Sequence, residues 1–317
     1  MRRLTANPAD FGKVAILMGG WSAEREVSLW SGAGVLAALQ RRGVDAVGVD
    51  ASRQTILNIG QHGFDRAFNV MHGTGGEDGT VQAALALQQL PYTGSGVLAS
   101  ALAMDKLRTK RIWRAEGLPT PDYAHLRNAA DLAAVEAQLG FPLFIKPVAD
   151  GSSVGVAKVK HRPDLLPAWN AARGEQGREV MAERGVAGGE YTCAILDGEP
   201  LPLIRIEPQG EFYDYHAKYI SDATRYHCPA DLDPAHETEL AELCLRAFEL
   251  LGAAGWGRVD FMLDAQGRPW LLEINTLPGM TTHSLLPMAA RAVGMDFDAL
   301  CWAILETTLD PAPERAT

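Results

Sequence analysis

The first 117 residues alternate short apolar runs with helical segments, and this alternation limits the fold more than any other feature of the sequence. The run KVAILMGG, from residue 13, predicts a strand, and residues 23–41 predict a helix that Ser22 could cap. Further strands are expected at 44–49 and 67–71, and further helices at 80–90 and 96–116. Because strands that alternate with helices form a parallel sheet covered on both faces, we expect an α/β domain over residues 1–117.

The pattern changes after Gly117, where Pro119 and Pro121 end the helix and shorter, more closely spaced strands begin. The segments FPLFIKPV and VAKVK predict a hairpin with a Gly/Ser-rich tip, followed by a helix and the strand REVMAER. A second boundary is expected between 185 and 189. The sequence therefore predicts a central domain at 118–187 and a C-terminal domain at 188–317.

The C-terminal part predicts the strands YTCAIL and LPLIRIEP joined by a DGEP turn, and a helix over 236–251. Between them, residues 212–229 form a polar, aromatic stretch that is too long for a simple connection. Loops of this length in compact domains are usually functional or mobile. We therefore expect this stretch to be functional or mobile.

Length and charge exclude several classes of protein. A chain of 317 residues predicts two or three packed units, and a net charge of −10 with mixed signs argues against a continuous basic surface for nucleic acid. Residues 1–10 do not read as a secretory signal, and no apolar run approaches the ~20 residues of a membrane span. The four cysteines have no zinc spacing, which favours reduced thiols in the cytoplasm.

The segment GWGRVDFMLDAQGRPWLLEINT, residues 255–276, predicts two antiparallel strands around a DAQG turn. A two-residue or a four-residue turn places Arg258 opposite Glu273 and Asp260 opposite Leu271. The two-residue period of a strand then puts Arg258, Asp260, Glu273 and Asn275 on one face of the sheet.

Carboxylates on one sheet face are unfavourable when buried without a partner, and a Mg²⁺ ion supplies the missing charge. Magnesium binds hard oxygen ligands and substrate phosphates, which suits Asp260, Glu273 and Asn275. The alternative is a solvated face with an ordinary Arg–Glu pair across the strands.

Two further features favour phosphate binding. The loop from Asp150 to Gly155 offers backbone N–H groups and two hydroxyls at a hairpin tip, although such loops are more often structural. Lys146 stands alone in an apolar strand and needs an anion or the surface. Lys106, in MDKLRTK, reads equally well as a solvated residue.

A competing signal is Gly94-Ser-Gly96-Val-Leu-Ala99, which follows a strand-like segment and opens a helix, as in a dinucleotide-binding fingerprint. It comes late in the α/β run, and the expected acidic residue on a following strand is not apparent. A nicotinamide-dependent oxidoreductase therefore ranks below an ATP-dependent enzyme.

The chain also resembles the D-alanine:D-alanine ligases of the ATP-grasp superfamily, from about residue 13 to about residue 305. The segments that carry the resemblance are GGWSAEREVSL, HGTGGEDGTVQ, YTGSGVLASALAMDK, IKPVADGSSVGVAKV, YDYHAKY, GWGRVDFM and LLEINTLPGMTTHSL. Seven such segments in the same order do not arise by chance. The resemblance implies three domains, with ATP held between the central and C-terminal ones.

The resemblance also assigns roles in the nucleotide site. It implies that Asp260, Glu273 and Asn275 bind two Mg²⁺ ions, or Mn²⁺ in their place. The residues that it assigns to ATP are Lys106, Lys146, Ser152 and Ser153 at the phosphates, Glu183, Arg184 and Val186 at the adenine, and Glu190 at the ribose. Arg184 stands where Lys is common in the family.

For the amino acid substrates, the resemblance places Glu24 at the ammonium of the first D-alanine and His72 near its carboxylate. Ser284, the Leu285 amide and Lys218 would hold the second carboxylate. Ser152, Tyr219 and Glu24 would form a hydrogen-bonded set over the site. Arg258 and the Gly279 amide would stabilise the oxyanion formed when the second amine attacks an acyl phosphate.

The resemblance thus implies a cytoplasmic ligase that joins two D-alanine molecules for peptidoglycan synthesis, as a homodimer through its N-terminal domain, with no nucleic acid or membrane partner. A D-alanine:D-lactate ligase is the alternative within the family. Tyr219 favours the dipeptide product, because depsipeptide-forming relatives often have Phe there. An ATP-binding module without catalytic activity is disfavoured, because the chain has all four residues of the set Arg258, Asp260, Glu273 and Asn275.

Overall fold

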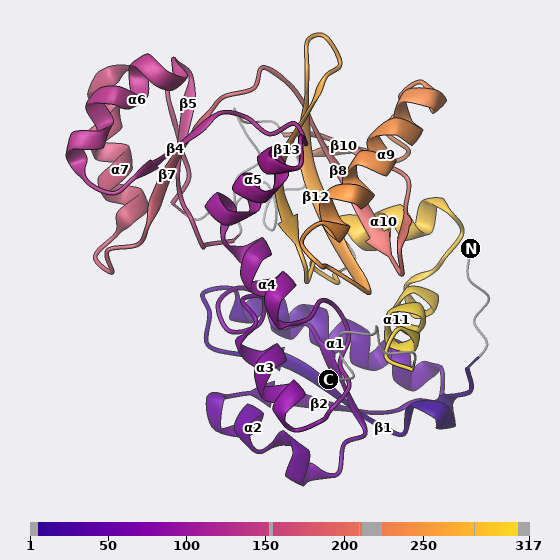
Figure 1. Ribbon diagram of the computed structural model, residues 1–317. Coiled ribbons are helices and arrows are strands. Elements are labelled where there is room, and N and C mark those ends of the chain that lie inside the picture. The colour runs from indigo at the N-terminus through magenta and orange to yellow at the C-terminus, as the bar shows by residue number, and fades with distance from the viewer. Residues whose placement is uncertain (1–5, 152–154, 209, 211–223, 282, 310–317) are drawn as a thin grey trace.

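The computed structural model describes residues 6–151, 155–208, 210, 224–281 and 283–309, which form three β-sheets with their covering helices (Figure 1). The first sheet is parallel and has the strand order β2-β1-β3. The other two, β4-β7-β5-β6 and β11-β10-β8-β12-β13, are antiparallel. In the figure the first sheet lies at the bottom, and the other two lie above it on opposite sides.

The central strand of the N-terminal sheet, β1, is buried on both faces, as the alternation of strands and helices predicts, whereas several residues of the edge strand β2 are exposed. Val14 and Ile16 of β1 pack with α1, whereas Ala15 and Leu17 point to the opposite face, toward α2 and α3. The elements of this part are β1 (Lys13–Gly19), α1 (Arg25–Arg41), β2 (Asp45–Ala51), α2 (Arg53–Leu57), β3 (Arg66–Asn69), α3 (Thr80–Leu87), α4 (Val97–Met104) and α5 (Lys106–Ala115), with 3-10 turns at Pro8–Phe11 and Ile59–His62.

The second sheet is apolar on one face only. Leu143 and Ile145 of β5 pack under α6 and α7, while Phe144, Lys146 and Glu183 belong to the other face. The elements are β4 (Tyr123–Leu126), α6 (Leu132–Leu139), β5 (Leu143–Pro147), β6 (Ala157–Val159), α7 (Leu165–Arg173) and β7 (Val180–Arg184), with 3-10 turns at Ala129–Asp131 and Arg162–Asp164. The predicted hairpin of β5 and β6 is confirmed.

The third sheet is covered on one face by α9, whose Leu240, Cys244 and Phe248 pack with Val259 and Phe261 of β12. Its opposite face turns toward the second sheet. The elements are β8 (Gly188–Leu196), β9 (Glu199–Pro200), β10 (Ile204–Glu207), β11 (Arg225–His227), α9 (Pro234–Glu249), β12 (Trp256–Asp264) and β13 (Pro269–Asn275).

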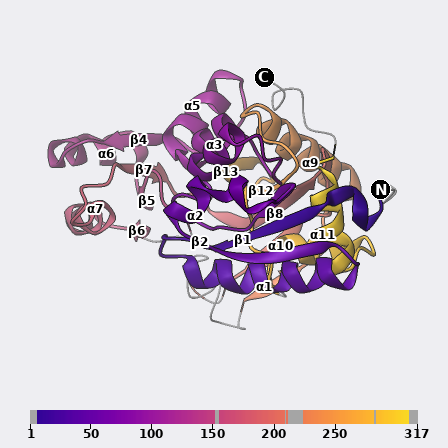
Figure 2. The same cartoon turned by 90° about the horizontal axis from the view of Figure 1, so that it is seen from below.

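The last two helices, α10 (Leu285–Ala292) and α11 (Phe297–Glu306), return to the N-terminal sheet. Trp302 of α11 packs edge-on against Phe11, and Arg41 at the end of α1 forms a bidentate ion pair with Asp298. Figure 2 shows α11 beside the end of α1. The N-terminal and C-terminal parts therefore share one hydrophobic core.

Three local expectations are wrong. Residues 96–116 form two helices rather than one, because Asp105 leaves the helical conformation and caps α5 by accepting the Arg108 N–H (2.9 Å). Ser22 does not cap α1; its hydroxyl accepts from Glu24 N and donates to His72 O. Residues 225–227, at the end of the expected loop, form strand β11 on β10. Residues 211–223 lie outside the described part.

The predicted register of the β12–β13 hairpin is also wrong, although its consequence holds. Arg258 faces Asn275, and Asp260 faces Glu273. A bulge after Asp260 leaves Leu272 as the extra residue, so that Phe261 pairs with Leu271. Because directly opposite residues share a face, the four polar side chains still lie together.

Over the described ranges, no helix is both long and apolar enough to cross a bilayer.

Candidate active site

Two cavities meet in the space enclosed by the three sheets. The larger, of about 560 Å³, lies between the polar faces of the second and third sheets. The smaller lies between the N-terminal part and the loop that follows β13. Lys106, Asp150 and Glu273 line both cavities, so these residues mark the point where the contents of one cavity would meet those of the other.

The predicted metal-binding residues come together on the β12–β13 hairpin. Asp260 is buried and accepts a bidentate ion pair from Arg258, with Nε–Oδ1 at 2.7 Å and Nη2–Oδ2 at 2.8 Å. Thr192 on β8 also donates its hydroxyl to Asp260 Oδ1 (2.6 Å). The Asn275 amide oxygen accepts the Leu277 N–H (3.0 Å). These contacts hold the oxygen atoms in place.

The donor set fits a hard divalent cation. Asp260 and Glu273 occupy facing positions, and Asn275 follows two residues after Glu273 on the same strand. Carboxylate and amide oxygens beside a phosphate-sized cavity are typical Mg²⁺ ligands. Within the described ranges, no three His, Cys, Asp or Glu residues gather in a cluster that would hold a metal by themselves. The site therefore suits a cation that takes further oxygens from a substrate.

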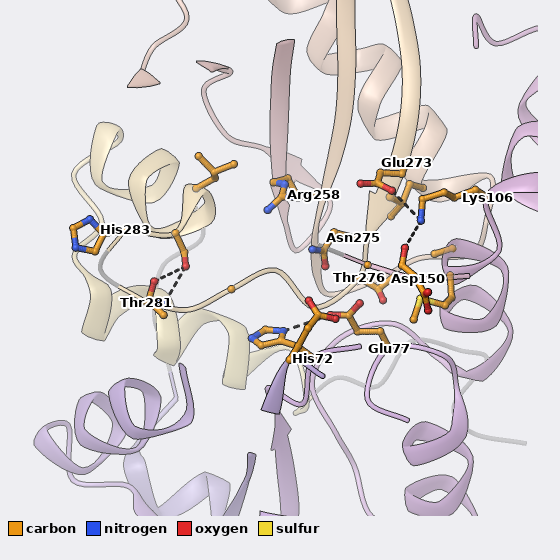
Figure 3. A pocket seen from close by; sticks show the side chains of 18 residues that line it. His72, Glu77, Lys106, Asp150, Arg258, Glu273, Asn275, Thr276, Thr281 and His283 are labelled. Carbon is orange, nitrogen blue, oxygen red and sulfur yellow. Dashed lines mark hydrogen bonds and ion pairs between the residues drawn. The ribbon is translucent and has the colours of Figure 1, made fainter. Parts of the chain in front are cut away.

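Lys106 lines both cavities, and Figure 3 shows its ammonium between Glu273 and Asp150. It is the first residue of α5, and its ammonium donates to Asp150 O (2.6 Å) and lies 3.2 Å from Glu273 Oε2. Asp150 is itself tied to Arg178. Lys106 is only 7% exposed, which answers the question that the sequence left open, because its charge faces the site rather than solvent.

Lys146 also points into the larger cavity, where it pairs with a buried glutamate. Its ammonium donates to Glu183 Oε1 (2.5 Å), and the other carboxylate oxygen, Oε2, lies 2.5 Å from the ammonium of Lys110. Glu183 thus lies between two cations. The expected anion partner of the isolated Lys146 is a protein carboxylate in this structure.

The remaining residues that the resemblance assigns to adenine and ribose also line the larger cavity: Arg184, Val186 and Glu190. The Arg184 guanidinium is half exposed and forms a surface ion pair with Asp122 (3.1 Å). Arg184 therefore borders the cavity, while its guanidinium is directed toward Asp122 at the surface.

The smaller cavity brings together Glu24 and His72 from the N-terminal part with Gly279, Ser284 and Leu285 from the C-terminal part. Glu24 is buried immediately before α1. It also reaches the Gly/Ser-rich loop of the second sheet, since a Cβ on Gly151 would stand 3.2 Å from Glu24 Oε2. All three parts of the chain thus meet at this carboxylate.

His72 joins the N-terminal part to the loop after β13. Its Nδ1 donates to Leu277 O (3.0 Å) and lies 3.4 Å from Glu77 Oε1, while its Nε2 lies 3.1 Å from Ser31 Oγ. Ser31 in turn accepts the Met280 N–H (3.1 Å). Figure 3 shows the His72 and Glu77 side chains below Asn275.

The loop after β13 ends at the N-terminus of α10. Ser284 precedes α10, so the Leu285 N–H belongs to the unpaired amides of the helix N-terminus, which favour a carboxylate. The Ser284 hydroxyl accepts the Thr281 N–H (3.0 Å). The backbone of Gly279 lies close to the Ser284 side chain, because a Cβ on Gly279 would stand 2.8 Å from Ser284 Oγ.

Four predicted site residues, Ser152, Ser153, Lys218 and Tyr219, lie outside the described residues. Sequence reasoning missed Lys110, Thr192 and Ser31. Lys110 had a signal, because a lysine between Lys106 and Trp113 on the buried side of one helix is unusual. Thr192 and Ser31 act through tertiary contacts and carried no signal.

The glycine pair that suggested a dinucleotide site has a packing role. Gly94 has a positive φ of 91°, and a Cβ there would stand 3.2 Å from Leu277 and 3.3 Å from Trp256 Nε1. The backbone of Gly255 also lies against Gly94. The turn before α4 is therefore filled by β12 and the loop after β13, which argues against the oxidoreductase.

The comparisons identify the class to which this fold and site belong. The family model described as "D-ala D-ala ligase C-terminus" matches residues 112–306, and "D-ala D-ala ligase N-terminus" matches residues 51–95. The first match alone covers more than half of the chain. The chain therefore belongs to the D-alanine:D-alanine ligase family.

Particular relatives agree with this assignment. A D-alanine–D-alanine ligase of Methylococcus capsulatus is 53% identical over 308 residues, which cover 97% of this chain and 99% of the relative. The crystal structure of the Bacillus anthracis enzyme is 36% identical, with a TM-score of 0.83 over 94% of this chain and 97% of that one. Its complex with ATP is 34% identical, with a TM-score of 0.81 over the same shares. The expected ATP-grasp fold is confirmed.

Proposed function

We propose that this protein uses ATP to join two D-alanine molecules into D-alanyl-D-alanine, with release of ADP and phosphate, for the synthesis of peptidoglycan precursors. The observation that carries the proposal is the meeting of the two cavities at Lys106 and Glu273. A nucleotide in the larger cavity would present its terminal phosphate to a carboxylate held in the smaller one, as the transfer of a phosphoryl group requires.

In the first step, the carboxylate of one D-alanine attacks the γ-phosphate of ATP and becomes an acyl phosphate. Glu24 receives the ammonium group of this D-alanine, and His72 borders its carboxylate. Lys106 and Lys146 offset charge on the phosphates. Asp260, Glu273 and Asn275 would hold Mg²⁺, two ions in the family and replaceable by Mn²⁺, which supplies further positive charge to the phosphates.

In the second step, the amine of the other D-alanine attacks the acyl phosphate. Its carboxylate lies at the N-terminus of α10, held by Ser284, the Leu285 N–H and Lys218. Arg258 and the Gly279 N–H face the developing oxyanion and stabilise it. Ser152 and Tyr219 join Glu24 in closing the site, because water would destroy the intermediate.

The proposed function is tested by measuring phosphate release from the purified protein with ATP, D-alanine and Mg²⁺, each omitted in turn. We expect release only when all three are present. ATP consumption without D-alanine, or hydride transfer to a nicotinamide cofactor, would contradict the proposal.

The alternative product is a depsipeptide, and Tyr219 argues against it. From an equimolar mixture of D-alanine and D-lactate at neutral pH, we expect almost only dipeptide. Tyr219→Phe removes a hydroxyl that would bond to Ser152 and Glu24, so we expect the variant to form detectable depsipeptide. The amount of depsipeptide should increase as the pH falls from about 8 to about 6, because more of the free D-alanine then carries an ammonium group, which is not a nucleophile.

Chromatography of radiolabelled products measures both outcomes. Substantial depsipeptide from the unmodified protein at neutral pH would favour the D-alanine:D-lactate ligase instead.

Three further features belong to this proposal. We propose domains at 1–117, 118–187 and 188–317; the three sheets, which follow one another in this order along the chain, support these boundaries, although α10 and α11 also pack on the first sheet. A homodimer through the N-terminal domain and a cytoplasmic location follow from the family resemblance.

A further inference from the structure

Lys110 is buried beside the nucleotide cavity without lining it. Its side chain is completely buried, on α5 one turn after Lys106. A lysine is almost never buried in this way unless it has partners, and the larger cavity is lined by Lys106, Lys146 and Glu183 but not by Lys110. Lys110 therefore acts on the site only through other residues.

The three donors of the Lys110 ammonium have three partners. It donates to the Thr120 hydroxyl (2.7 Å) and to Leu271 O (3.2 Å), and it forms an ion pair with Glu183 Oε2 (2.5 Å). The Thr120 hydroxyl also donates to Leu271 O (2.8 Å). Because Leu271 borders the bulge of β13, Lys110 is anchored to the strand that carries Glu273.

Glu183 has one oxygen for each of two lysines. Oε2 faces Lys110 and Oε1 faces Lys146, and the carboxylate is only 3% exposed. Burial by itself raises the pKa of the Glu183 carboxyl, but the charges of Lys110 and Lys146 outweigh burial and hold that pKa below its usual value. Burial lowers the pKa of Lys110 to about 8, against the opposing effect of Glu183.

The two lysines differ in what they can reach. Lys146 lines the cavity and is 9% exposed. Lys110 does not line the cavity, and its ammonium is held by hydrogen bonds to Thr120 and Leu271. If Lys146 were the only partner of Glu183, its approach to a phosphate would leave a buried carboxylate without a counter-ion, which is strongly unfavourable. A second, fixed cation removes that conflict.

We propose that Lys110 is a positioning residue of the nucleotide site, whose ammonium pairs with Glu183 so that Lys146 is available to the phosphates of ATP. The inference rests on the proposed function for the role of Lys146 at the phosphates of ATP, and on the structure for the pairing of Glu183 with both lysines. It assigns to Lys110 no contact with any substrate.

The test replaces Lys110 by Met, which has similar length and no charge. We expect Lys110→Met to raise the KM for ATP by roughly tenfold or more, while the KM for each D-alanine changes by less than about twofold. Arg111→Met is the matched control, because Arg111 is the neighbouring, exposed cation of the same helix. The control should leave both constants unchanged.

A double variant separates charge compensation from a packing role. In a Glu183→Gln background there is no carboxylate to neutralise, so Lys110→Met should change the KM for ATP by less than about twofold relative to Glu183→Gln alone. This comparison also applies if the single variant Lys110→Met does not fold.

An unchanged KM for ATP in folded Lys110→Met, equal effects of that substitution in both backgrounds, or equal rises in the KM for ATP and for D-alanine would each overturn the inference. These outcomes are distinct from failure of the proposed function, in which the unmodified protein itself would not couple ATP to D-alanine.

Discussion

Glu273→Gln is expected to lower phosphate release by roughly 100-fold or more at millimolar Mg²⁺. Glu273 lies opposite the buried Asp260 and 3.2 Å from the Lys106 ammonium, at the junction of the two cavities. The substitution keeps the shape of the side chain but removes its negative charge. It therefore weakens the hold on a divalent cation and leaves Lys106 without its carboxylate partner.

Asn275→Ala should have an effect of the same kind, because it removes the neighbouring oxygen that we propose as a metal ligand, together with the acceptor of the Leu277 N–H. Glu239→Gln is the matched control, since the Glu239 side chain is 78% exposed on α9. Steady-state phosphate release, with thermal unfolding to verify the fold, measures the effect. Near-normal turnover in both site variants would falsify the metal assignment.

Arg258→Met is expected to lower the rate of dipeptide formation by roughly 10²–10³-fold, because it removes the side-chain donor that we propose for the developing oxyanion. The Arg258 guanidinium is held in place by two bonds to Asp260, so it needs little reorganisation when charge develops. Thr192 still donates to Asp260 in the variant, which limits the disturbance of that carboxylate.

The first chemical step provides a sharper readout. Acyl phosphate formation does not use the oxyanion donor, so trapping with hydroxylamine should still yield D-alanine hydroxamate from Arg258→Met when little dipeptide forms. Arg268→Met is the control, because Arg268 is an exposed arginine on the same hairpin that pairs with Asp264. If hydroxamate and dipeptide fell together, Arg258 would act in the first step instead.

Local sequence patterns were sufficient to predict most elements. The apolar runs at β1, β2 and β3 alternate with helical segments and so predicted a parallel sheet, which the structure confirms. The polar residues on β12 and β13 predicted a shared face, and this prediction holds because the register differs from the expected one by two residues, a shift that keeps the same side chains on one face. The bulge after Asp260 was not predicted. The carbonyl of Leu271, beside the bulge, accepts hydrogen bonds from Lys110 of α5 and from Thr120, which are distant in sequence.

Other features depend on contacts between distant parts of the chain. Asp105 interrupts the predicted helix because its side chain caps α5. The backbone N–H of Lys106 bonds to Val148 O, which turns α5 toward the second sheet. The return of α10 and α11 to the N-terminal sheet was also not predicted, since their apolar faces show that they are buried but not against which partner.

The sequence by itself determined the order of the elements, the candidate ligands on one hairpin face and the family, because these depend on residue type and spacing along the chain. Only the tertiary structure decided that Glu183 lies between Lys110 and Lys146, and that His72 joins two parts of the molecule through Leu277. Charges that compensate one another when buried come from segments with no fixed spacing in sequence, so only packing can reveal their partners.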